Sequence, residues 1–301
     1  MADFKTKRIE YINNWPNIKR FEAELQYEEK FRSINNGTPF IPFKMVVDNN
    51  EFYNKAVSFL IDAVESLGHK PNHSFEFIFT AYDIYSKSVY SINRITNRNW
   101  RLTPDLCTLI EGDTNLKNAF SNLISHIPQK SLQYLFVGIH KSQILDRSTK
   151  NSLGAEDSNR LALLNKVNSN YPNDFANYAN AIRPGSRLLY HILTDSSVSI
   201  DSLTYHISFE DQLHILLSGY IYSLRNDTAH GSAISITKSS MTNMATMANS
   251  YFAFLLTYYL FLLLTIDHIS NNKSQDLANL AQNITLNLNN YINLFGHALS
   301  K

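Results

Sequence analysis

The sequence predicts an all-α protein, and two features of the chain support this fold class. The 301 residues include only 9 Gly and 8 Pro, and so few helix breakers favour long helices over a sheet with many turns. Apolar residues make up 44% of the chain, and they recur at helical spacing along most of it. The length suffices for one large hydrophobic core or two modest domains.

The first half of the chain predicts one exposed helix followed by several amphipathic helices. The exposed helix is expected to begin at Asn14, ahead of Pro16, and it carries charges on most of its faces. An extended segment pinned by Pro39 and Pro42 follows, and Asn50 then serves as an N-cap. Apolar periodicity predicts helices over 52–67, 75–90, 104–111, 116–127 and 132–145.

The middle of the chain predicts shorter elements and one small β unit. Residues 146–159 are polar and lack periodicity, which indicates a loop. Alternating apolar and polar residues over 197–207 predict a strand or a hairpin. Short helices, punctuated by Pro172 and Pro184, are expected over 160–167, 174–182 and 187–193.

Three strong helices are expected in the last part of the chain. Ser208 begins the first, with Asp211 three residues later as an imperfect capping box. The second includes the uncharged segment 241–266, whose most apolar part, Tyr251–Ile266, falls short of the roughly 20 residues that span a membrane. A buried central helix is therefore favoured, with a membrane span as the alternative. The third is amphipathic and covers 277–291.

These elements suggest three regions. Residues 1–49 form an N-terminal helical extension, residues 50–270 form the main helical domain, and residues 271–301 form a C-terminal amphipathic helix. No composition shift marks a boundary, so the division rests on the order of the expected elements.

Charge and cysteine content narrow the classes of protein. The formal net charge is +1, whereas proteins that coat long nucleic acids are usually more basic, so any nucleic acid would bind in a local cleft. A single cysteine, Cys107, excludes an intramolecular disulfide framework and suits a reducing compartment. The polar N-terminus lacks the apolar stretch of a signal peptide. We therefore expect a cytoplasmic protein.

No metal or cofactor is expected. His69 and His73 have a metal-like spacing, but Lys70 and Pro71 between them prevent one helical face from presenting both. The chain contains no glycine-rich phosphate loop and no His-Glu-x-x-His pattern.

The segment RNDTAHG, residues 225–231, is the strongest candidate for a functional site. Arg225 is expected at the end of the Ser208 helix. Asp227 or Thr228 is expected to cap the apolar helix, and His230 then lies in the first turn of that helix. The polar side chains would converge where the two helices meet.

Arg225, Asn226 and His230, with four residues between Arg and His, resemble the Arg-x4–6-His motif of the HEPN family. In that family the motif, often written Arg-Asn-x-x-x-His, lies at the junction of two helices in an all-α bundle. Gly231 and the apolar helices on both sides of the motif are also similar. The resemblance implies a HEPN-type helical bundle for residues 50–270, with additional N-terminal and C-terminal helices.

The resemblance also implies a metal-independent endoribonuclease, in which the RNA 2′-hydroxyl attacks phosphorus to give 2′,3′-cyclic phosphate and 5′-hydroxyl ends. His230 suits general acid–base work because imidazole titrates near neutral pH. Arg225 would stabilise charge on the phosphoryl oxygens, and Asn226 would orient the phosphate or His230. The family implies a homodimer with a composite site, a role in phage defence or a toxin system, and an inhibitor or activating partner.

Further residues are weaker candidates for binding RNA. Asp227 could orient His230 or act as an N-cap, and Tyr222 could reach the cleft or pack in the core. Arg183 and Arg187 flank Pro184-Gly185 and could contact the RNA backbone or lie in a solvated loop. Two other functions stay open: a non-catalytic HEPN-like module that binds RNA, nucleotide or a protein partner, and a membrane-anchored helical protein.

Overall fold

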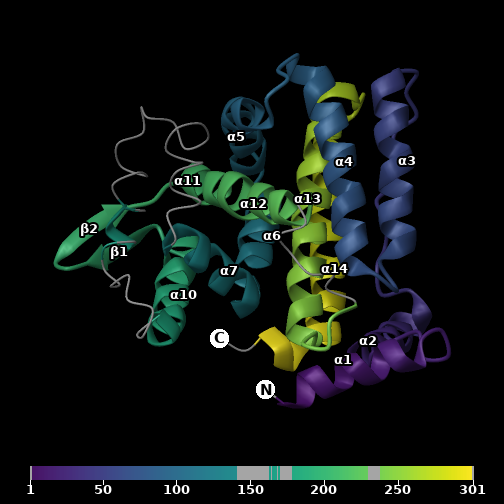
Figure 1. Ribbon diagram of the computed structural model, residues 1–301. Helices are drawn as coiled ribbons and strands as arrows, with labels where there is room; N and C mark the ends of the chain where they lie inside the picture. Colours follow the sequence, from purple (N-terminus) through teal and green to yellow (C-terminus); the bar gives the residue numbers. More distant parts are fainter. Residues whose placement is uncertain are drawn as a thin grey trace.

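A computed structural model describes residues 2–140, 163, 165–167, 169, 178–229 and 238–299. Within these residues the protein is mostly helical and contains one small antiparallel hairpin (Figure 1), which confirms the all-α class. The helices are α1 (Ala2–Asn14), α2 (Glu22–Ser33), α3 (Glu51–Ser66), α4 (Pro71–Tyr90), α5 (Ile95–Glu111), α6 (Thr114–Ser125), α7 (Gln129–His140), α10 (Tyr178–Thr194), α11 (Phe209–His214), α12 (Tyr222–Ala229), α13 (Met244–Ile269) and α14 (Lys273–Phe295).

Helix α13 is the central helix of the hydrophobic core. Every residue from Met247 to Ile266 is buried, and α13 packs against α4, α14, α5 and α7. Figure 1 shows α3, α4, α13 and α14 side by side, and the helix that contains α11 and α12 runs roughly perpendicular to them, with its α12 end near α13. Helix α13 is long and apolar enough to cross a membrane, but 83% of its most apolar stretch of residues is buried inside the protein. The expectation of a buried central helix is therefore confirmed for the described residues.

The N-terminal region differs from the sequence-based expectation. Asn14 ends α1 rather than beginning a helix, and the next helix, α2, starts only at Glu22. Helix α2 is also partly buried: the Tyr27 ring is fully enclosed, and its hydroxyl donates to the Leu67 carbonyl at 2.5 Å. The charges on α2 did not indicate exposure, because the buried carboxylate of Glu24 pairs with the distant Lys238 at 2.7 Å.

The segment between α2 and α3 is extended, as its prolines predict. It lies along α13 and α14, where the Ile41 amide donates to the side chain of Asn287 and the Ile41 carbonyl accepts from Asn283 and Asn287. The Phe43 amide donates to the Tyr258 hydroxyl at 2.7 Å. One hydrophobic core includes residues of all three expected regions, from Tyr27 to Leu299, while the boundaries at 49 and 270 stay predictions.

Several local expectations are confirmed. Asn50 caps α3 by accepting from the Tyr53 amide, and Ser208 and Asp211 form a capping box at the start of α11. The expected hairpin is present as β1 (Ser197–Ile200) and β2 (Leu203–His206).

Other expectations differ from the structure or lie outside its described part. Helices α10 and α5 continue through Pro184 and Pro104, because the cost of one missing backbone donor is offset by packing of the rest of each helix. The expected loop over 146–159 lies outside the described residues.

Candidate functional site

The helix that carries the candidate motif has an irregular backbone. Helix α11 continues into a π-helical segment, η2 (Ile215–Ile221), and then into α12. All residues of η2 are buried. A π-helical turn shifts the side chains that follow it around the helix axis, and such turns are frequent at functional sites. The motif residues of α12 come directly after this shift.

Arg225 and Asn226 lie next to each other on α12. The Arg225 Nη1 donates to the Asn226 Oδ1 at 3.2 Å. The Arg225 guanidinium carbon lies 5.6 Å from the centroid of the buried Phe79 ring, in a cation–π contact. Arg225 is half-buried, and no carboxylate among the described residues pairs with it. The guanidinium therefore retains donors for an external anion.

Asp227 and Thr228 do not cap the following helix, so that prediction is wrong. Both lie within α12: the Tyr134 hydroxyl donates to the Asp227 carboxylate at 2.6 Å, and the Thr228 hydroxyl donates to the Leu224 carbonyl. The N-cap of α13 is Asn243, whose side chain accepts from the Thr246 amide. Helix α12 ends at Ala229 and α13 begins at Met244, whereas the sequence pattern suggested that the two helices meet directly at the motif.

His230 lies outside the described residues, so its geometry relative to Arg225 stays a prediction. One expectation about it is nevertheless corrected. His230 is not in the first turn of α13, which begins at Met244.

The weaker candidates are distributed over two elements. Tyr222 is partly buried and packs against the hydrophobic core, which agrees with the alternative of core packing. Arg183 and Arg187 are exposed one turn apart on α10, so they lie on a helix rather than in a loop. Arg187 lines a small cavity of about 200 Å³ that is also lined by Tyr190 and His191, and none of the lining residues belongs to α12.

A buried polar cluster lies beside the motif helix, and sequence analysis did not identify it. The Ser131 hydroxyl on α7 donates to the Asn249 Oδ1 at 2.7 Å, and the Tyr220 hydroxyl donates to the same oxygen at 2.9 Å. Ser131 and Tyr220 also contact each other at 3.0 Å. Burial raises the pKa of Tyr220 well above its usual value, so the phenol stays a neutral donor. These residues are far apart in the sequence, and no local pattern connects them.

A cavity of about 510 Å³ adjoins this cluster; we refer to it as the Asn249 cavity. It lies between α7, α10 and the start of α13. Its lining includes the polar side chains of Lys130, Gln133, Tyr134, Thr246 and Asn249. Val137, Ile182 and Met241 contribute apolar side chains. Tyr134 connects the cavity to the motif, because its hydroxyl donates to Asp227.

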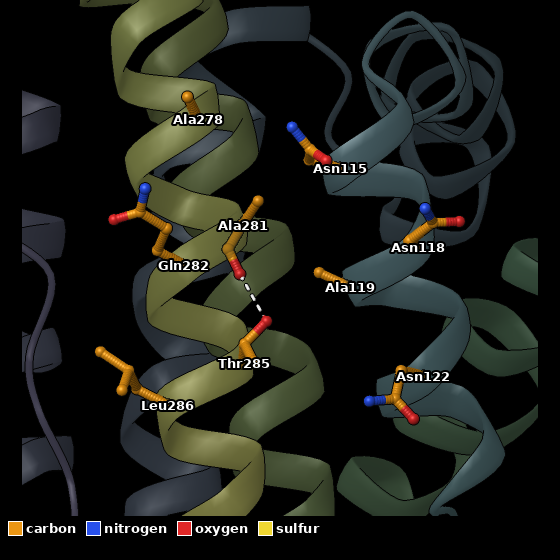
Figure 2. Close-up of a pocket in the computed structure, with 9 residues that line it drawn as sticks. All are labelled: Asn115, Asn118, Ala119, Asn122, Ala278, Ala281, Gln282, Thr285 and Leu286. Carbon is orange, nitrogen blue, oxygen red and sulfur yellow. Dashed lines mark hydrogen bonds between the residues drawn. The ribbon is translucent and has the colours of Figure 1, made fainter.

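A larger hollow of about 700 Å³ lies between α6 and α14 (Figure 2). Three asparagines of α6, Asn115, Asn118 and Asn122, form one side, and the other side is formed by small or uncharged residues of α14. None of its lining residues belongs to α12 or α7. The hollow carries neither acid–base groups nor charge, so it is a weaker candidate for chemistry than the region around Arg225.

The described residues contain no group of three or more His, Cys, Asp and Glu side chains that could hold a metal ion. His69 lies 3.1 Å from Glu28, and His73 lies 3.4 Å from Glu76. The two histidines thus have separate acidic partners instead of facing a common point.

Comparison with protein-family models, with curated proteins and with solved structures gives no match for this chain. The HEPN resemblance therefore rests on the residues of the motif and the helices around it.

Proposed function

We propose that this protein is a cytoplasmic, metal-independent endoribonuclease of the HEPN type, with Arg225, Asn226 and His230 as its catalytic residues. The observation that carries the proposal is the set of contacts that the Arg225 guanidinium makes. The guanidinium rests on the Phe79 ring, contacts the neutral Asn226 and has no acidic partner among the described residues. An arginine held in this way is suited to bind a phosphate, because none of the described carboxylates neutralises its charge.

The roles follow from the chemistry of each group. Arg225 stabilises the negative charge that develops on the phosphoryl oxygens. Asn226 adds a hydrogen-bonding group without adding charge, and its contact orients the Arg225 guanidinium. His230 removes the proton from the RNA 2′-hydroxyl or protonates the leaving 5′-oxygen. The products are a 2′,3′-cyclic phosphate and a 5′-hydroxyl.

A single histidine cannot act easily on both sides of one phosphorus. We therefore propose a symmetric homodimer in which two copies of the motif meet in one cleft. A role in phage defence or in a toxin system would suit such an enzyme, with an inhibitor or an activating partner to restrain it.

The test is RNA cleavage in the presence of EDTA. Wild-type protein, Arg225→Ala and His230→Ala are incubated with total RNA, and the product ends are mapped. Loss of a general acid–base group typically lowers the rate by about 10²–10⁴-fold. Arg101→Ala and His206→Ala serve as matched controls, because they remove the same side-chain types from exposed positions on α5 and β2.

Cleavage that persists in EDTA and disappears in both motif variants, but not in the controls, would support the proposal. Equal cleavage by wild type and His230→Ala would refute it. RNA binding without cyclic-phosphate products would instead indicate the non-catalytic HEPN-like module. Light scattering on the purified protein tests the dimer.

A further inference from the structure

The Asn249 cavity contains a polar side chain whose orientation is fixed by its neighbours. Asn249 is 8% exposed, and its Oδ1 accepts from both the Ser131 and the Tyr220 hydroxyls. Its Nδ2 donates to no acceptor among the described residues, and this nitrogen is not fully enclosed by protein atoms. Since Asn249 lines the cavity, the amide nitrogen presents two donors to this space.

Buried donors are normally paired, since leaving them without an acceptor is costly. Here the Asn249 amide is pre-oriented by two hydroxyls that are themselves buried: Ser131 and Tyr220 are both 0% exposed. Such an arrangement suits recognition of an external acceptor, because little ordering is left to occur on binding.

The rest of the cavity fits one kind of ligand. Val137, Ile182 and Met241 provide apolar surface, and Tyr134 provides an aromatic side chain, which suit the flat faces of a nucleobase. Gln133 adds a further amide. The exposed Lys130 is the one charged side chain among the described lining residues, and it suits a phosphate. The volume of about 510 Å³ lies within the usual range for small-ligand sites.

The cavity is linked to the motif helix through Tyr134. Tyr134 lines it and donates to Asp227, two residues after Arg225, and Tyr220 lies on the segment that leads into α12. A base in the cavity would thus lie beside the helix that carries the motif, on the side of Asp227, whereas Arg225 rests on Phe79 of α4.

We propose that the Asn249 cavity binds a base of the RNA substrate, with the Asn249 Nδ2 donating to an acceptor on that base. The identity of the ligand as RNA rests on the proposed endoribonuclease activity. The cavity thereby sets the sequence preference of cleavage, while the motif performs the chemistry.

The test uses an RNA pool with randomised sequence and the variant Asn249→Asp. This substitution keeps an acceptor for Ser131 and Tyr220 but replaces the donor that faces the cavity with an oxygen. Asn118→Asp, an exposed position on α6, makes the same chemical change elsewhere. Cleavage sites are mapped by sequencing, and circular dichroism melting confirms that both variants are folded.

We expect wild type and Asn118→Asp to share a base preference at a fixed position relative to the cut. Asn249→Asp should lose about tenfold in cleavage at the preferred base, because one hydrogen bond is replaced by repulsion between acceptors. An unchanged base profile in folded Asn249→Asp would overturn the inference and leave the endoribonuclease proposal intact.

A second measurement separates the two proposals. Binding of a short, fully 2′-O-methylated RNA of mixed sequence is followed by fluorescence anisotropy in the His230→Ala background, with and without Asn249→Asp. If wild type cuts no RNA but binding still falls about tenfold with Asn249→Asp, the cavity inference stands and the catalytic proposal fails. If wild type cuts no RNA and Asn249→Asp also leaves RNA binding unchanged, the cavity inference fails together with the catalytic proposal.

Discussion

Gly185 allows α10 to approach α7 closely, and its replacement by alanine is a sharp test of this packing. A Cβ added at Gly185 would lie 2.2 Å from Cε2, 2.4 Å from Cδ2 and 2.5 Å from Cζ of Phe136. The Phe136 ring is fully buried on α7, so moving it would displace neighbouring side chains of the close-packed core. Gly185→Ala should therefore force the two helices apart or distort the ring.

Two opposing effects determine the sign of the change in stability. Replacing glycine by alanine inside a helix stabilises that helix by about 1 kcal/mol. Overpacking of a dense core costs about 1–3 kcal/mol, and contacts this short with a fixed ring place the cost at the upper end. The free energy of unfolding should therefore fall by about 2 kcal/mol in Gly185→Ala.

Urea denaturation followed by circular dichroism measures this difference. Gly296→Ala is the matched control, because no heavy atom lies within 4 Å of a Cβ at that position. The double variant Gly185→Ala/Phe136→Leu should recover part of the loss, since the smaller side chain makes room. If Gly185→Ala proves as stable as wild type, the close approach of α7 and α10 is refuted. The shape of the Asn249 cavity between these helices would then be refuted as well.

Three further predictions concern buried polar groups. Arg98→Met should lower the free energy of unfolding by about 3 kcal/mol, because the buried guanidinium donates to the Ser86 hydroxyl and to the Ile92 and Asn93 carbonyls, which Met leaves without their donor. The exposed Arg101→Met should change it little, and equal losses would contradict this reasoning. Burial raises the pKa of the Cys107 thiol to about 12, so a thiol reagent at pH 8 should modify the urea-unfolded protein but not the native one. Burial also raises the pKa values of Tyr53 and Tyr85 to about 12. The stability that these neutral phenols contribute is present below their unfolded pKa of about 10, and melting temperatures should fall as the pH rises from there through 12.

Elements with strong local signals could be predicted from the sequence. Helix α3 begins after its expected cap Asn50, and the capping box of Ser208 and Asp211 begins α11. In both places the capping side chain at the start of the helix accepts a hydrogen bond from the backbone amide three residues later. The whole interaction therefore lies within four consecutive residues. The alternation that predicts the hairpin is local in the same way.

The N-terminal helices could not be predicted, because their environment is set by distant residues. The Glu24 carboxylate is buried against Lys238, and Tyr27 donates to Leu67. Charge on every face of a helix normally indicates solvent exposure. Here the charges are paired with groups from other parts of the chain, so the local pattern carried no information about burial.

The candidate site was predicted only in part, for the same reason. Arg225 and Asn226 do lie together on α12, because neighbours in sequence stay neighbours in a helix. The role of Asp227 required knowledge of Tyr134, which precedes it by 93 residues. Asn249 has the appearance of a polar interruption in an apolar helix, and only its contacts with Ser131 and Tyr220 show why it is there.

Helix α7 contributes to both parts of the proposed site. The motif belongs to α12, but α7 supplies both Tyr134, which holds Asp227, and Ser131, which holds Asn249. Helix α7 therefore connects the segment proposed to perform chemistry with the cavity proposed to select the base. A change in the position of α7 would move both together, so base selection and catalysis should respond jointly to changes that shift this helix, whereas Asn249→Asp should alter selection alone.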